Sequence, residues 1–153
     1  MDDSKGETVK VPALGISISA QYATGRTVVF QTHVDLETSK DDLIRIVDKL
    51  NAIADRDEAF YAIEQAERQL EVETNATKNM ARRLEEIETN ISIKMTAEGK
   101  RNPKLSAQDE MQKKQARDTL EEGKKRVAIA QKFLDELKQK AGNRDGADSG
   151  PSN

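Results

Sequence analysis

Toward the C-terminus, small and apolar residues follow one another at alternating intervals of three and four positions. The run consists of Leu120, Gly123, Val127, Ala130, Leu134, Leu137 and Ala141. A mean spacing of 3.5 residues keeps these side chains on one side of an α-helix, where they pack along a second helix. A shorter run lies upstream and consists of Met80, Leu84, Ile87 and Ile91. The two runs predict a mainly α chain with a long antiparallel helical hairpin, a coiled coil.

The first helix is expected over residues 38–95. Thr38 is a suitable N-cap, and Asp41 follows three residues later, as in a capping box. Neither glycine nor proline interrupts the segment. The spacing of its apolar positions shifts near 55–57, where an aspartate would cap a new helix. A break at 55–57 is therefore an alternative to one continuous helix.

Residues 96–106 are expected to reverse the chain, because they contain glycine, asparagine and proline in close succession. Ser106 and Asp109 then repeat the capping arrangement, which predicts a second helix over 107–141. Gly142 follows directly and is expected to end that helix.

Upstream of the helices the hydrophobic period changes to two. Apolar and polar residues alternate over 11–35, and Gly25 lies between the two runs as a turn residue, which predicts a two-stranded β-hairpin. The polar ends, 1–10 and 142–153, are interpreted as a flexible leader and a disordered tail. Because an isolated β-hairpin is marginally stable in water, we expect its apolar face to cover a helix or its edges to pair with another chain.

The second helix is too short to cover the whole of the first. The apolar segment 43–60 would have no helical partner, so the β-hairpin of the same chain or another subunit must cover it. Phe60 fits the core stripe of this segment, whereas Tyr61 lies at its edge or acts as an exposed anchor. The residues expected at a protein interface are Leu43, Ile46, Leu50, Ile53, Phe60, Tyr61, Ile16, Ile18 and Phe30.

The composition argues against an enzyme. Of 153 residues, 35% are charged and only 35% hydrophobic, which is too polar for a large core around a desolvated pocket. The chain has no cysteine and one histidine, His33, with no identifiable partner for acid–base or metal chemistry. Helix starts and solvated faces account for the carboxylate clusters Asp41/Asp42, Asp55/Asp57/Glu58 and Glu85/Glu86/Glu88. We expect no catalytic residue, no cofactor and no metal site.

Several features bear on location. No apolar run approaches the roughly 20 residues of a membrane span. The first ten residues are polar, unlike a signal peptide, and the lack of cysteine suits a reducing compartment. The sequence therefore predicts a cytoplasmic protein without membrane association.

The preferred hypothesis is a non-enzymatic coiled-coil interaction or assembly protein, an accessory factor that acts as a homo-oligomer or docks to a protein partner. A chaperone-like helical hairpin is one alternative. Another is an accessory nucleic-acid-binding protein, although a net charge of -3 and 3% aromatic residues speak against it. Its candidate contacts are Lys100, Arg101, Lys104, Lys113, Lys114, Arg117, Lys124, Lys125 and Arg126.

Overall fold

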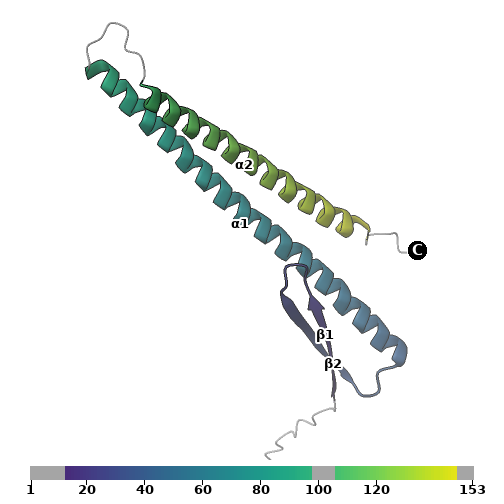
Figure 1. Ribbon diagram of the computed structural model, residues 1–153. Coiled ribbons are helices and arrows are strands. Elements are labelled where there is room, and N and C mark those ends of the chain that lie inside the picture. The colour runs from purple at the N-terminus through teal and green to yellow at the C-terminus, as the bar shows by residue number, and fades with distance from the viewer. Residues whose placement is uncertain (1–12, 98–105, 148–153) are drawn as a thin grey trace, which may run out of the picture. The chain divides into compact units, whose positions relative to one another are not determined.

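The computed structural model describes residues 13–97 and 106–147, and it confirms the predicted fold class (Figure 1). A β-hairpin precedes two long helices that pack against each other. The proposed leader at 1–10 and most of the proposed turn at 96–106 lie outside the described residues, as does the end of the tail. In chain order the elements are β1 (Ala13–Gln21), β2 (Thr27–Asp35), α1 (Lys40–Ala97) and α2 (Ala107–Ala147).

The chain divides into two compact units, and α1 contributes to both. The N-terminal unit comprises residues 1–61, and the C-terminal unit comprises residues 62–153. The first therefore contains the β-hairpin with the start of α1. The second contains the rest of α1 together with α2.

The β-hairpin has a three-residue turn that ends in a left-handed glycine. The backbone N–H of Tyr22 donates to the carbonyl of Arg26 at 2.8 Å, and Gly25 N–H donates to the Tyr22 carbonyl at 2.9 Å. Gly25 has φ of 83°, a value that favours glycine. Beyond this turn β1 and β2 pair antiparallel without interruption, from Gln21 opposite Thr27 to Ala13 opposite Asp35. The regular register gives the hairpin two distinct faces.

One face of the hairpin is apolar and partly covered. Its cross-strand pairs are Leu14/Val34, Ile16/Thr32, Ile18/Phe30 and Ala20/Val28. All of these side chains except Leu14 are half-buried, whereas the intervening β1 and β2 residues are exposed. Leu50 and Ala54 of α1 are 8% and 5% exposed, so this stretch of α1 is covered within one chain. The prediction that the hairpin covers a helix therefore agrees with the N-terminal unit.

The first helix starts two residues later than the sequence indicated. Its N-cap is Ser39, because the Ser39 hydroxyl accepts from the Asp42 N–H at 3.2 Å and donates to the Asp42 carboxylate at 2.7 Å. Thr38 donates instead to the Asp35 carbonyl at 2.7 Å and closes the preceding turn. From Lys40 the helix runs for 58 residues without the break that was an alternative at 55–57.

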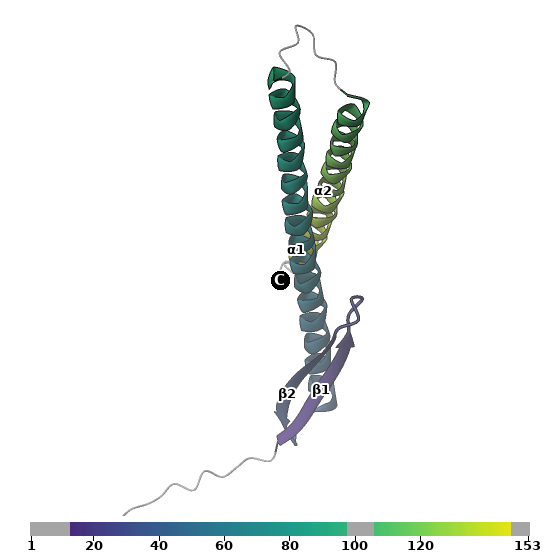
Figure 2. The ribbon, with the colours of Figure 1, turned by 60° about the vertical axis from the view of Figure 1, so that its left-hand side comes forward.

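The second helix confirms the predicted seam and extends it. Ser106 and Asp109 form the predicted cap, with the Asp109 N–H 3.1 Å from the Ser106 hydroxyl. Where the α2 side chains are described, the buried and half-buried residues recur at intervals of three and four. They are Asp109, Lys113, Ala116, Leu120, Gly123, Val127, Ala130, Leu134, Leu137 and Ala141. α2 lies along the second half of α1 in Figure 1, and Figure 2 shows that the two helices cross at an angle.

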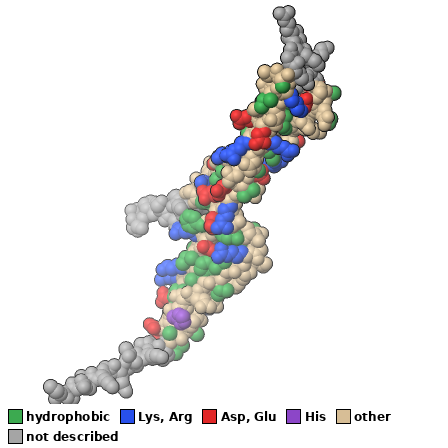
Figure 3. Space-filling model, turned by 90° about the vertical axis from the view of Figure 1, so that its left-hand side faces the viewer, with side chains coloured by type: hydrophobic (Ala, Val, Ile, Leu, Met, Phe, Trp, Pro, Cys, Tyr) green, Lys and Arg blue, Asp and Glu red, His purple; other side chains and the backbone are tan. Residues whose placement is uncertain are grey.

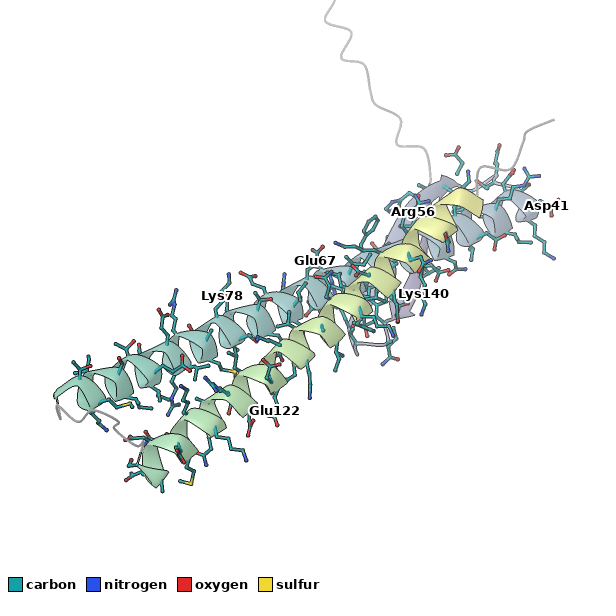
Figure 4. The ribbon with its side chains drawn as sticks, turned by 90° about the horizontal axis from the view of Figure 1, so that it is seen from above. Asp41, Arg56, Glu67, Lys78, Glu122 and Lys140 are labelled. Carbon is teal, nitrogen blue, oxygen red and sulfur yellow. The ribbon has the colours of Figure 1, made fainter. Side chains whose placement is uncertain are left out.

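Ion pairs between the helices define an antiparallel register. Lys94 pairs with Asp109 at 3.3 Å, and Glu73 pairs with Arg126 at 3.1 Å. Glu67, labelled in Figure 4, pairs with Lys138 at 2.8 Å. As residue numbers fall along α1 they rise along α2, so one register persists from the Lys94–Asp109 pair to the Glu67–Lys138 pair.

The end of α2 differs from the sequence-based expectation. The helix continues through Gly142 to Ala147. A glycine ends a helix when it adopts a positive φ, and Gly142 does not. Glycine inside a helix costs about 1 kcal/mol relative to alanine, which long helices tolerate.

Thr77 of α1 and Gly123 of α2 form a layer of the seam without a large apolar side chain on either helix. A Cβ atom at Gly123 would lie 2.9 Å from Thr77 Oγ1 and 3.1 Å from Met80 Sδ. The Thr77 hydroxyl oxygen is buried and has no hydrogen-bond partner among the described residues. Gly123 therefore lets the helices approach closely at this layer, which compensates for its poor helix propensity.

Two glycine substitutions on α2 are expected to have opposite effects on stability. Gly123→Ala gains helix propensity but forces the stiff Thr77 side chain to move, so we expect a net loss of about 1 kcal/mol. Gly142→Ala meets nothing within 4 Å and should stabilise the protein by up to about 1 kcal/mol. Urea unfolding followed by circular dichroism measures both. Equal stabilisation by the two variants would contradict the close approach at Gly123.

Candidate interaction site

The residues predicted at a protein interface divide into covered and exposed groups. Leu50 is buried. The half-buried members are Leu43, Ile46, Tyr61, Ile16, Ile18 and Phe30. Ile53 and Phe60 remain 51% and 61% exposed. Seven of the nine predicted residues are therefore at least partly buried within this unit.

Phe60 is the member whose placement differs most from expectation. The sequence put it in the core stripe, whereas its side chain is largely exposed. Consecutive helical residues are rotated by about 100°, so only one of Phe60 and Tyr61 can face the hairpin turn. Tyr61 does so, because its ring centroid lies 6.4 Å from that of Tyr22 and 4.7 Å from the guanidinium carbon of Arg26.

Five residues, which we call the turn cluster, contribute side chains to the contact between the hairpin turn and α1. They are Tyr22, Arg26, Asp57, Glu58 and Tyr61. The Tyr22 hydroxyl donates to the Asp57 carboxylate, and the Ala23 backbone N–H donates to Glu58 Oε1 at 2.9 Å. The Arg26 guanidinium lies over the Tyr61 ring, in cation–π geometry.

Tyr22 is the most buried side chain of the turn cluster, at 3% exposed. Burial, followed by its hydrogen bond to Asp57, raises the pKa of Tyr22 to about 12. The hydroxyl is thus held as a neutral donor, a role that suits a structural contact.

The sequence did not reveal the role of Asp57 and Glu58. Both were interpreted as helix-start or solvated charges, yet both accept hydrogen bonds from the hairpin turn. The shifted apolar spacing near 55–57 was the available signal. At that point α1 makes polar contacts with the turn.

Large apolar side chains stay exposed in both units. On α1 of the N-terminal unit, Ile53 and Phe60 are seven residues apart and share one side of the helix. Ile44, 50% exposed, lies on the opposite side. In the C-terminal unit, Ile129 and Phe133 of α2 are 69% and 55% exposed. On the face drawn in Figure 3, hydrophobic side chains are interspersed with charged ones.

A groove between α1 and α2 is lined mainly by polar side chains. They include Asn90 of α1 with Gln112 and Gln115 of α2, while Met80 and Ile87 add apolar surface. Among the described residues, no group of three or more histidine, cysteine, aspartate or glutamate side chains is placed to hold a metal ion. Charged groups also line the groove, namely Arg83, Glu86, Asp118 and Glu122.

The candidate nucleic-acid contacts are mostly engaged in ion pairs where they are described. Lys113 and Arg117 both pair with Glu88, at 3.2 and 2.8 Å. These two cations hold the pKa of the Glu88 carboxyl below its usual value. Lys124 pairs with Glu121, and Arg126 pairs with Glu73 as described above. Lys100, Arg101 and Lys104 lie outside the described residues.

Lys114 and Lys125 are exposed members of the same candidate set. Lys78 of α1, labelled in Figure 4, lies on the side of α1 that faces away from α2. The basic residues are thus distributed around the helices together with acidic ones. This arrangement gives the nucleic-acid hypothesis no additional support.

Comparison of the chain with protein-family models, curated proteins and solved structures found no match. Within the described residues, neither helix has a stretch that is long and apolar enough to cross a membrane. Functional inference therefore rests on the chain's own residues.

Proposed function

We propose that this protein is a non-enzymatic interaction protein that assembles with itself through its N-terminal unit. The exposure of Ile53 and Phe60 on one side of α1 is the observation that carries the proposal. Because each residue is already partly covered, burying the rest of its side chain would contribute about 1 kcal/mol. Docking to a different protein through the same surface is the alternative form of this proposal.

The small core of the N-terminal unit supports the proposal. Tyr22, Leu50 and Ala54 are its buried apolar residues among those described. A two-stranded sheet on a single helix buries little surface, and domains of this size gain stability from association. A homo-oligomer would supply that additional burial. We also propose that the protein is cytoplasmic, as the sequence predicts.

The solution mass tests the proposal directly. Light scattering or sedimentation should give a mass of at least twice 17.0 kDa. Ile53→Gln/Phe60→Gln removes the exposed apolar side chains without touching the core, and it should raise the dissociation constant at least about 100-fold.

Ile44→Gln is the matched control, since Ile44 is similarly exposed on the other side of the same helix. It should leave the mass unchanged. A wild-type protein of 17.0 kDa at all attainable concentrations would refute self-association. An assembly equally sensitive to both variants would refute the assignment to the Ile53/Phe60 side.

A further inference from the structure

The two-stranded sheet leaves one backbone edge of each strand unpaired among the described residues. The turn identifies which groups lie on these edges. Tyr22 and Arg26 are a hydrogen-bonded pair, and such pairs alternate with non-bonded ones along antiparallel strands. It follows that the even-numbered residues of β1 bond to β2. The N–H and C=O groups of Ala13, Gly15, Ser17, Ser19 and Gln21 point out of the open edge.

The β1 edge lacks the features that usually prevent strand addition. The strand sequence, ALGISISAQ, contains no charged residue and no proline over nine residues. Natural edge strands are protected by lysine, proline, bulges or short length. The outward-pointing backbone groups also belong mainly to small residues, so another backbone can approach them. β2 differs, since Val29, Gln31, His33 and Asp35 occupy its open edge.

β1 is complementary to a second copy of itself. When two β1 strands run antiparallel about a two-fold axis at Ser17, Gly15 lies opposite Ser19 and Ala13 lies opposite Gln21. These are the residues with outward-pointing N–H and C=O groups, so both strands form hydrogen bonds in the same register. Because the strand is uncharged, identical copies meet without like-charge repulsion.

The apolar face also continues across this pairing. Ile16 lies opposite the second copy's Ile18, and Leu14 lies opposite its Ala20, a large side chain against a small one. Leu14 is 45% exposed and gains a neighbour. Two hairpins joined in this way form a four-stranded sheet with one apolar face, which has the independent stability that two strands lack.

We propose that the β1 edge binds β1 of a second copy of this chain, antiparallel and centred on Ser17, to form a continuous four-stranded sheet. This inference rests on the proposed self-association and names its backbone contact. The occupant is a second copy rather than an unrelated strand, because the register, the absence of charge and the apolar pairs are all satisfied by β1 itself.

Proline substitution tests whether the β1 edge forms the hydrogen bonds of the dimer. The Ser17 N–H points away from β2, so Ser17→Pro removes an outward donor and leaves the β1–β2 hydrogen bonds in place. We expect the dissociation constant of the dimer to rise at least about 100-fold. Gln31→Pro is the matched control, because Gln31 is the direct partner of Ser17 on β2 and its N–H points out of the opposite edge. It should leave the dimer intact.

Single cysteines test the register without relying on proline. The chain has no cysteine, so each introduced thiol is unique. With a short bis-maleimide, Ser17→Cys should cross-link to its own copy most efficiently, while Gly15→Cys and Ser19→Cys, about 14 Å from their copies, should react less and equally. A maximum at Gly15 or Ser19, or efficient cross-linking of Gln31→Cys in place of Ser17→Cys, would overturn the proposal.

The outcomes separate this inference from the proposed function. A dimer that Ser17→Pro leaves unchanged, and in which Ser17→Cys does not cross-link, refutes the β1 pairing while self-association stands. A wild-type chain that is monomeric refutes both. Dissociation by Ser17→Pro, together with symmetric cross-linking at Ser17, establishes the four-stranded sheet.

Discussion

Replacing Leu134 by aspartate is expected to separate α2 from α1 and to unfold the C-terminal unit. Leu134 is 4% exposed and belongs to the seam of α2. The substitution removes a large apolar side chain and places a carboxylate in a buried position of the seam. Losses of this kind amount to about 4–5 kcal/mol, a large part of the stability of a small domain. Thermal unfolding followed by circular dichroism at 222 nm should show a much lower midpoint.

Ile129→Asp provides the control for Leu134→Asp. It makes the same chemical change five residues earlier on α2, but Ile129 is 69% exposed. Substitutions at such surface positions usually change stability by no more than about 0.5 kcal/mol. Similar destabilisation by the two variants would show that Leu134 does not lie in a seam between the helices.

Tyr22→Ala is expected to release the β-hairpin from α1. The change removes the most buried ring of the N-terminal unit and its hydrogen bond to Asp57, and it deprives Tyr61 of an aromatic neighbour. Hydrogen exchange by mass spectrometry should report the loss. Amides of β1 and β2 should exchange about 100-fold faster or more, whereas those of α2 should keep their protection. Unchanged exchange over β1 and β2 would contradict the assigned role of Tyr22.

The conservative variant Tyr22→Phe and a titration distinguish the contribution of the Tyr22 ring to stability from that of its hydroxyl. Tyr22→Phe keeps the ring and loses the Asp57 bond, so its effect should be much smaller than that of Tyr22→Ala. Folding raises the pKa of Tyr22 from 10.0 to about 12. The contribution of the neutral Tyr22 hydroxyl to stability is therefore fully present below pH 10 and is lost as the pH rises through 12. In a Tyr61→Phe background, Tyr22 is the sole tyrosine. Its phenolate absorbance should then appear with a midpoint near pH 12.

The hydrophobic pattern of the sequence predicted the position of the α2 seam correctly. The run from Leu120 to Ala141 is the described seam of α2, and Ser106 caps that helix as expected. The same seam continues to Asp109 and Lys113, which hydrophobic periodicity cannot detect because both are charged. Their half-burial depends on partners, since Asp109 pairs with Lys94 and Lys113 with Glu88.

Contacts between segments distant in sequence were the part that could not be predicted. Which of Phe60 and Tyr61 faces the hairpin depends on where the turn at Gly25 lies against α1. Likewise, Asp57 and Glu58 resemble ordinary surface carboxylates until Tyr22 and the turn backbone approach them. Residue pairs such as Tyr22 and Asp57 are 35 positions apart, beyond the reach of any local pattern.

The layer formed by Thr77 and Gly123 discriminates between alternative alignments of the two helices. A repeat with a mean of 3.5 residues presents an almost identical apolar seam after a shift of seven positions, so hydrophobic burial alone distinguishes such alignments poorly. A seven-residue slip would place Leu84 opposite Gly123, where in the observed alignment even a Cβ atom at Gly123 would lie 2.9 Å from Thr77 Oγ1. A leucine does not fit there without separating the helices. Gly123, which lowers the helix propensity of α2, thus favours the observed alignment of the two helices over alignments slipped by seven residues.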